Sequence, residues 1–277
     1  MIPKVPEKYC DGAIGPDGIP MRFKKGYKDY GVNDDLLCTV HYPNIKLTSV
    51  IWFHTPEIYY HPKYPMRKMN VETLKASLYA AKHDILALQF WLSANKISLK
   101  EGKVNLTKTY VPGNFIVFYK QNIDYAILKF LMYDDRYEDK IDMYPHTFYY
   151  VDGLTYGYSD ENIRGWYLRD YLQHKGIKKY GKDKWFAKGD KVWMRNMTKL
   201  RKQLEKSGEL DEFDQRINGI KKAAKKFIKD TFKSKKFKAL KKEIKAMIVP
   251  ISELVPKIRC DEEDKKDLLK FLNSLTK

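Results

Sequence analysis

The sequence predicts an α+β protein: a mixed N-terminal domain with antiparallel strands and one long helix, followed by a lysine-rich, mainly helical C-terminal region. Two observations carry this prediction. Up to residue 158, β-branched and aromatic runs alternate with turn residues, whereas beyond it apolar residues recur at helical spacing. Most of the net positive charge also lies in this second region. We therefore expect an α+β domain at 1–158, beginning with an irregular arm (1–34), and a basic helical region at 159–277.

Strand and helix signals follow one another in the N-terminal domain. Asn70 caps an amphipathic helix that is expected to run to about residue 95. Asp152 and Gly153 lie between two aromatic runs and predict a type I′ hairpin. The segment 123–133 is apolar nearly throughout and fits either a buried helix or a buried strand. The expected strands are 35–42, 46–53, 104–111, 114–120, 148–151 and 154–157.

Helix signals dominate the C-terminal region. Ser159 caps the first helix, and a glycine-containing link at 174–191 predicts a loop with short helical turns. A second helix at about 192–206 is expected to stop at Ser207 and Gly208. The remaining expected helices are a long one from about 210 to 247, with a break near Ser234, and a last one after Cys260.

Composition excludes several classes of protein. No run of about 18 apolar residues is present, so no transmembrane helix is expected. The N-terminus lacks the apolar stretch of a secretory signal. The three cysteines (Cys10, Cys38 and Cys260) are too few and too scattered for a disulfide framework, which predicts reduced thiols and a cytoplasmic protein, in the host cytoplasm or the virion if the source is viral.

The net charge of +18 is concentrated in one stretch of the chain. Residues 174–246 hold 25 Lys+Arg against 9 Asp+Glu, whereas residues 1–173 hold 22 against 20. The whole chain has 44 Lys and 9 Arg. Lysine supplies a flexible point charge rather than the planar fork with which arginine reads bases, so a lysine-led surface predicts sequence-independent contact with phosphates. An AT-rich genome also enriches lysine, but would not gather the excess in one stretch.

The segment 217–248 combines an apolar stripe with dense lysine on the other faces. We expect this cationic face to bind nucleic acid. The alternatives are a membrane-surface or calmodulin-target helix, and a solvated face of a core helix. The expected nucleic-acid-binding residues are Lys221, Lys222, Lys225, Lys226, Lys229, Lys233, Lys235, Lys236, Lys238, Lys241, Lys242 and Lys245, with Lys178, Lys179, Lys182, Lys184, Lys188 and Lys191 from the preceding link.

Three aromatic residues, Trp185, Phe186 and Trp193, lie among these lysines. Aromatic side chains can stack the exposed bases of single strands. Large aromatic residues are more often part of a core, and that is the default interpretation for these three.

Two groups of residues raise the question of a metal ion. Cys38, His41, His54 and His61 are close in sequence, but the strand expected at 35–42 would place the first two on opposite faces, which disfavours structural zinc. An acidic run could hold Mg²⁺ for phosphodiester cleavage, although its spacing matches no nuclease pattern. No cofactor is expected for a binding protein, whereas a nuclease would be expected to use Mg²⁺. The candidate ligands in the acidic run are Asp134, Asp135, Glu138, Asp139 and Asp142, with His146 nearby.

Residues 155–157 (Thr-Tyr-Gly), followed by Arg164 and His174, resemble the second half of the GIY-YIG nuclease signature over about 30 residues. The resemblance implies that Tyr156 helps to activate water and that Arg164 steadies the phosphate. The sequence departs from the family pattern in two ways. Tyr150 is closer to Tyr156 than the family's loop requires, and no following strand with a metal-binding glutamate is evident.

The function that the sequence predicts is non-sequence-specific binding of nucleic acid, expected to be DNA, through the lysine-rich helices. Lysine, tyrosine and asparagine richness suits a phage or viral protein that processes, packages or protects DNA. The alternatives are a metal-dependent nuclease and a structural, virion-type assembly protein that docks on acidic partners. Other proteins of an assembly are possible further partners.

Overall fold

The structure is a computed structural model with an α+β fold. It describes residues 5–10, 14–28, 34–52, 75, 79–80, 82–83, 86–89, 99–100, 103–104, 115–133, 145–186, 189–246, 248–250, 266, 269–270 and 273–274. The chain forms two compact units that are interleaved in sequence. The first unit comprises Met1–Cys10, Tyr30–Asp142 and Ser234–Lys277, and the second comprises Asp11–Asp29 and Met143–Lys233. Each unit therefore contains residues from both sides of the domain boundary expected at residue 158.

The first unit is built around a four-stranded antiparallel sheet with the order β1-β5-β2-β6. Its strands are β1 (Thr48–Trp52), β2 (Leu86–Gln89), β5 (Phe115–Tyr119) and β6 (Ile248–Pro250). Val117 on β5 pairs with Val50 on one side and with Leu88 on the other, and its side chain is fully buried. A short hairpin of β3 (Leu99–Lys100) and β4 (Lys103–Val104) forms a second sheet.

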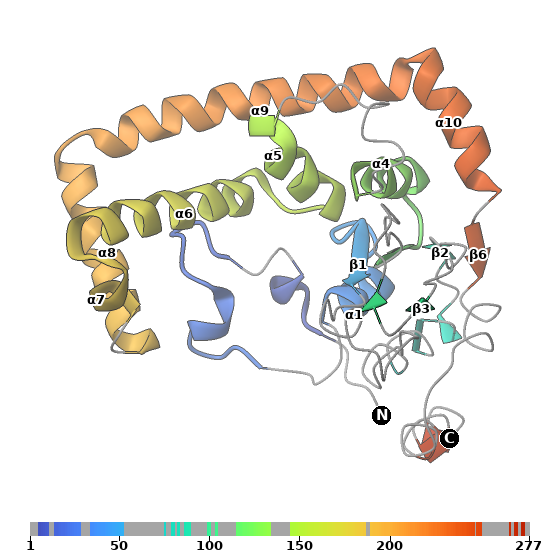
Figure 1. The fold of residues 1–277 in the computed structure, drawn as a ribbon, viewed down its shortest axis with the longest axis horizontal. Coiled ribbons are helices and arrows are strands. Elements are labelled where there is room, and N and C mark those ends of the chain that lie inside the picture. The colour runs from blue at the N-terminus through green and yellow to red at the C-terminus, as the bar shows by residue number, and fades with distance from the viewer. Residues whose placement is uncertain are drawn as a thin grey trace. The chain divides into compact units, whose positions relative to one another are not determined.

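Helices complete the core of this unit. The segment 123–133 forms α4 (Ile123–Tyr133), which follows β5 and buries Ile127, Leu128 and Phe130. The helix α10 (Lys235–Lys245) buries Phe237, Leu240 and Ile244 and leads toward β6 (Figure 1). The fourth strand of the sheet thus comes from the C-terminal part of the chain, about 130 residues after β5.

The strand expected at 35–42 is wrong, because the segment forms the helix α1 (Asp34–His41). Five consecutive residues (36–40) are buried there and point in all directions around the helix axis, so this helix is enclosed in its unit. The hydroxyl of Thr39 donates to the carbonyl of Asp35, 3.0 Å away, as β-branched hydroxyl residues do within helices.

A disulfide joins Cys10 to Cys38 of α1, with the two Cα atoms 5.2 Å apart. The expectation that these thiols are reduced is therefore wrong. Both cysteines are buried. Their sequence separation of 28 residues gave no sign of pairing, because proximity here depends on how the N-terminal segment packs.

The helix expected between residues 70 and 95 is wrong in its C-terminal part, where β2 begins at Leu86. Residues 75, 79–80 and 82 are helical. Leu86 and its neighbours pair with strands on both sides, and this non-local pairing outweighs the local helical pattern. The strands expected at 46–53 and 114–120 are confirmed as β1 and β5. Most of the strand expected at 104–111 lies outside the described residues.

The second unit is helical. It consists of α5 (Pro145–Tyr156), α6 (Asp160–Tyr180), α7 (Lys182–Phe186), α8 (Asp190–Lys206) and α9 (Glu209–Lys233), which Figure 1 shows in sequence. The hairpin expected around Asp152 and Gly153 is wrong, because α5 runs through both residues. A Cβ added at Gly153 would lie 2.7 Å from the side chain of Ile163 on α6. The glycine therefore serves close helix packing, not a turn.

Local capping signals set most helix boundaries in this part of the chain. The Ser159 side chain accepts a hydrogen bond from the backbone N–H of Asn162 and begins α6, as predicted. The α6 helix runs to Tyr180, so the loop expected from residue 174 is wrong over its first seven residues. The predicted stop of α8 at Ser207 and the break at Ser234 are confirmed, and the Ser234 hydroxyl accepts from the N–H of Phe237.

The arm segment 14–28 belongs to the second unit and packs on α6. A Cβ on Gly165 would lie 2.1 Å from the carbonyl oxygen of Gly15, so the two backbones approach too closely for any side chain. Gly18 adopts a φ of +78°, and its Cβ position is 3.2 Å from the backbone nitrogen of Arg169. The proline- and glycine-rich sequence therefore allows close backbone contact.

Candidate nucleic-acid interface

The helix α9 has an apolar face and a cationic face. Six buried residues form the apolar face: Leu210, Phe213, Ile217, Ile220, Ala224 and Ile228. On the opposite side, Lys222, Lys226, Lys229 and Lys233 follow one another at intervals of four, three and four residues and are all exposed. We call these four the outer stripe of α9. It extends about 16 Å along the helix, and within the described residues none of its members is in an ion pair.

Two other lysines of α9 lie beside the apolar face and have partners. The ammonium groups of Lys221 and Lys225 lie 2.8 and 2.6 Å from the same oxygen of Asp160, on α6. The hydroxyl of Tyr150 donates to the other oxygen of Asp160 at 2.8 Å. Partial desolvation acts to raise the pKa of Asp160, but the hydrogen bonds from the two lysines and Tyr150 outweigh it and hold the pKa at about 2.

The helix α10, in the first unit, repeats this arrangement. Its outer stripe consists of Lys235, Lys238, Lys242 and Lys245, which are exposed on the side away from the buried Phe237, Leu240 and Ile244. Lys236 is also exposed. Lys241, next to the apolar face, forms an ion pair with Asp124 at the start of α4.

The helix α8 presents a third row of cations, of which only Lys191 was among the expected nucleic-acid-binding residues. Arg195, Lys199 and Lys202 are exposed along the same helix. Their spacing of four and three residues, opposite the buried Met197, Leu200 and Leu204, was the signal that could have identified them.

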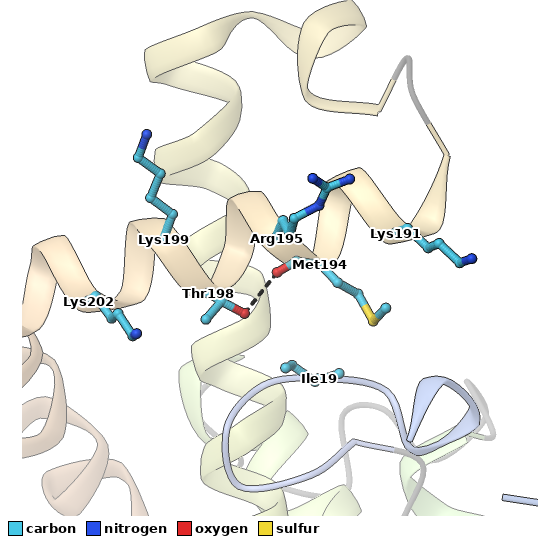
Figure 2. Close-up of a pocket in the computed structure, with 7 residues that line it drawn as sticks. All are labelled: Ile19, Lys191, Met194, Arg195, Thr198, Lys199 and Lys202. Atoms are coloured by element: carbon cyan, nitrogen blue, oxygen red, sulfur yellow. Dashed lines mark hydrogen bonds between the residues drawn. The ribbon is translucent and has the colours of Figure 1, made fainter. Parts of the chain in front are cut away.

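A shallow depression lies between α8 and the arm of the same unit (Figure 2). Met194 points toward Ile19 across it, and the Thr198 hydroxyl donates to the carbonyl of Met194 at 2.9 Å. Lys191 and Lys202 flank it, whereas Lys199 points away from Ile19. The depression therefore has an apolar floor and cationic edges.

Four lysines of the predicted set gather where α6 meets α7. Lys178, Lys179, Lys182 and Lys184 are all exposed, and Lys179 donates to the side-chain oxygen of Gln203 on α8 at 2.9 Å. Lys188 lies outside the described residues. Exposed lysines of the second unit thus come from α6, α7, α8 and α9, and Lys25 and Lys28 of the arm are exposed as well.

Arg164, the candidate phosphate ligand of the nuclease hypothesis, is engaged within the second unit. Its guanidinium donates from Nε and Nη2 to the two carboxylate oxygens of Asp214, at 2.6 and 2.8 Å, and from Nη1 to the carbonyl of Pro16 at 3.2 Å. Tyr156 lies in the last turn of α5 and stacks on Tyr158. The contacts of Arg164 join α6, α9 and the arm, which indicates a structural role.

The metal-site hypotheses fall largely on residues that the structure does not describe. Asp134, Asp135, Asp139 and Asp142 lie outside the described residues, as do His54 and His61. In the described part of the chain, no group of three or more His, Cys, Asp or Glu residues is placed to hold a metal ion.

The environment of Cys38 and His41 differs from the expected one. The two residues lie on a helix at a spacing of three, not on opposite faces of a strand. Cys38 is in the disulfide, and His41 Nε2 lies 2.6 Å from the hydroxyl of Tyr79, whose pKa is raised by burial. Cys38 therefore offers no thiolate for zinc.

Of the aromatic residues among the lysines, Trp185 is a core residue and Trp193 is partly buried. Trp185 is 1% exposed, and Trp193 packs edge-on against Phe23 of the arm. The side chain of Phe186 lies outside the described residues. The default interpretation is confirmed for Trp185.

Comparisons with protein-family models, with curated proteins and with solved structures found no match. Among the described helices, none is both long and apolar enough to cross a bilayer.

Proposed function

We propose that this protein binds DNA through its phosphate backbone, without reading sequence, by means of exposed lysine stripes. The observation that carries the proposal is the outer stripe of α9: four exposed lysines in one line, opposite the buried face of the same helix. The α8 cations in the same unit and the outer stripe of α10 in the first unit support it. Such binding suits DNA processing, packaging or protection, which need no sequence recognition.

The physical argument is one of charge spacing. Duplex DNA carries one charge per about 1.7 Å of its axis, so the length of the outer stripe of α9 corresponds to roughly ten phosphates. Four lysines can each find a phosphate over that distance. Each contact releases condensed counterions, which makes the affinity depend steeply on salt. Lysine confers no preference among bases, because it lacks the planar fork that recognises guanine.

A salt series tests the proposal. Binding of a labelled 30-base-pair duplex by the full chain is measured by fluorescence anisotropy between 50 and 400 mM NaCl. The same measurement is made on a variant with Lys222, Lys226, Lys229 and Lys233 replaced by glutamine. We expect the slope of log K against log salt to become shallower by about 3 to 4, because four phosphate contacts are lost.

The matched control is a chain with Lys221→Gln and Lys225→Gln, which removes cations from the same helix that are already paired with Asp160. Its slope should change by less than about 1. Two outcomes contradict the proposal: no binding by the wild-type chain at 50 mM salt, or an affinity that does not change with salt.

A further inference from the structure

The second unit carries an aromatic ring at the surface among lysines. Tyr180, the last residue of α6, is 37% exposed, and its ring stacks on that of Trp185 with centroids 5.9 Å apart and planes 7° from parallel. Trp185 itself is buried. One side of the tyrosine is therefore covered by an indole, while part of its surface faces solvent.

The position of this pair is set by two glycines. A Cβ on Gly176 would lie within 2.3 to 2.4 Å of the indole ring of Trp185, so only glycine lets the indole lie directly against α6. Gly181, with a φ of +80°, ends α6 and turns the chain into α7, which carries Trp185 back under Tyr180. The stacked pair thus depends on glycine at both positions.

The surroundings of Tyr180 are cationic. Lys178, Lys182 and Lys184 are exposed within four residues of it in sequence, and the ammonium of Lys179 lies 5.3 Å from the centre of its ring. A base lying on the tyrosine would have its flanking phosphates within reach of these lysines. Aromatic surfaces combined with lysines in this way bind single strands, because unpaired bases expose their faces.

Two other exposed aromatic residues of this unit lack this combination. Trp166 has two cations near it in sequence, Arg164 and Arg169, but each guanidinium already donates to a carboxylate, that of Asp214 and that of Asp170 respectively. Tyr149 is 71% exposed but lies on α5, which contains no lysine or arginine. Among the exposed aromatic rings in the described part of this unit, Tyr180 combines a stacked support with neighbouring lysines.

We infer that Tyr180 stacks an unpaired base, so that this surface of the second unit binds single-stranded DNA. The inference rests on the proposed function, since the neighbouring lysines must hold phosphates, and it adds a contact to the base. The contact is independent of sequence, because every base has an aromatic face.

The test separates the contribution of the bases to the affinity from that of the phosphates. Binding of a labelled 12-nucleotide oligothymidylate is compared with that of a 12-unit abasic strand, which has the same backbone charge and no bases, at 100 mM NaCl. We expect the wild-type chain to bind the thymidylate about tenfold more tightly than the abasic strand. Tyr180→Ala should abolish this preference and leave binding of the abasic strand unchanged, whereas Tyr180→Phe should retain the preference.

Two further variants serve as controls. Tyr149→Ala removes an equally aromatic, more exposed residue and should leave the preference intact. Tyr180→Leu keeps apolar contact with Trp185 and should lose the preference, which guards against a folding defect in the alanine variant. Equal binding of both strands by the wild-type chain, or a preference that survives Tyr180→Ala and Tyr180→Leu, overturns the inference. Absent or salt-insensitive binding of the 30-base-pair duplex overturns the proposed function and the inference with it, whereas salt-dependent duplex binding without a preference for the thymidylate overturns the inference alone.

Discussion

The inner and outer lysines of α9 and α10 have the same side chain and different surroundings. The inner lysines (Lys221, Lys225 and Lys241) lie next to the buried face of their helix, and each reaches a carboxylate on another helix of its own unit. The outer stripes lie farther around the same helices and have no ion-pair partner in the described part of the chain. The local charge excess therefore combines cations that hold helices together with cations that face solvent.

This difference follows from rotation about the helix axis. Successive residues are about 100° apart, so Lys221 and Lys222 point in very different directions although they are adjacent. An ion pair at the edge of an apolar face is partly shielded from water, whereas a fully hydrated lysine contributes little to stability. The outer lysines can thus contact a ligand without giving up an interaction that stabilises the fold.

The largest effect is expected when both outer stripes are removed together. A variant with Lys222, Lys226, Lys229 and Lys233 of α9 and Lys235, Lys238, Lys242 and Lys245 of α10 replaced by glutamine loses eight potential phosphate contacts. We expect DNA affinity at 100 mM salt to fall by about four orders of magnitude. Anisotropy gives the affinity, and urea unfolding should show a nearly unchanged free energy. Retained affinity would place the binding surface elsewhere.

Arg164→Ala should have the largest effect on stability. It removes two hydrogen bonds to the Asp214 carboxylate and one to Pro16, and leaves a partly buried carboxylate without its partner. We expect the free energy of unfolding to fall by about 2 kcal/mol. Urea denaturation measures it.

The same variant separates a structural Arg164 from a catalytic one. Plasmid cleavage is measured with and without Mg²⁺ for the wild-type chain and for Arg164→Ala. Mg²⁺-dependent cleavage that disappears in a variant that remains folded would favour the nuclease hypothesis over backbone binding.

Removal of the inner pair should affect folding more than binding. Lys221→Gln with Lys225→Gln takes two ion-pair partners from Asp160, while Tyr150 still donates to it. We expect a loss of about 1 kcal/mol in stability, since both lysines are partly exposed. Thermal unfolding followed by circular dichroism checks this. If this variant loses as much DNA affinity as the variant that lacks the outer stripe of α9, then paired and exposed lysines contribute equally to binding.

The smallest effect is the pH dependence that Asp160 contributes. Its folded pKa of about 2 lies below the ordinary value of 3.8, so its contribution is complete above that ordinary value and is lost as the pH falls through about 2. We expect wild type to exceed Asp160→Asn in stability by somewhat less than 1 kcal/mol at pH 6. Urea titrations from pH 6 downward should show this difference shrinking, and a difference that grows in acid would be inconsistent with the lysine contacts.

Part of the candidate site was predictable because it depends on local periodicity. The apolar stripe and the outer lysines of α9 follow from residue spacing alone, and α8 has the same signal at Arg195, Lys199 and Lys202. The pairing of Lys225 with Asp160, 65 residues away, has no such signal. Nor does the stacking of Tyr180 on Trp185, which requires a turn at Gly181.

The sequence by itself determined the helix boundaries with capping residues, at Ser159, Ser207 and Ser234, because a cap involves only neighbouring backbone groups. The tertiary structure decided the identity of α1, α5 and β2, where burial in the core, close glycine packing and pairing with distant strands prevailed over local preference. It also decided which lysines are paired. An ion pair needs a carboxylate within a few ångströms, and only the packing of helices far apart in sequence brings one there.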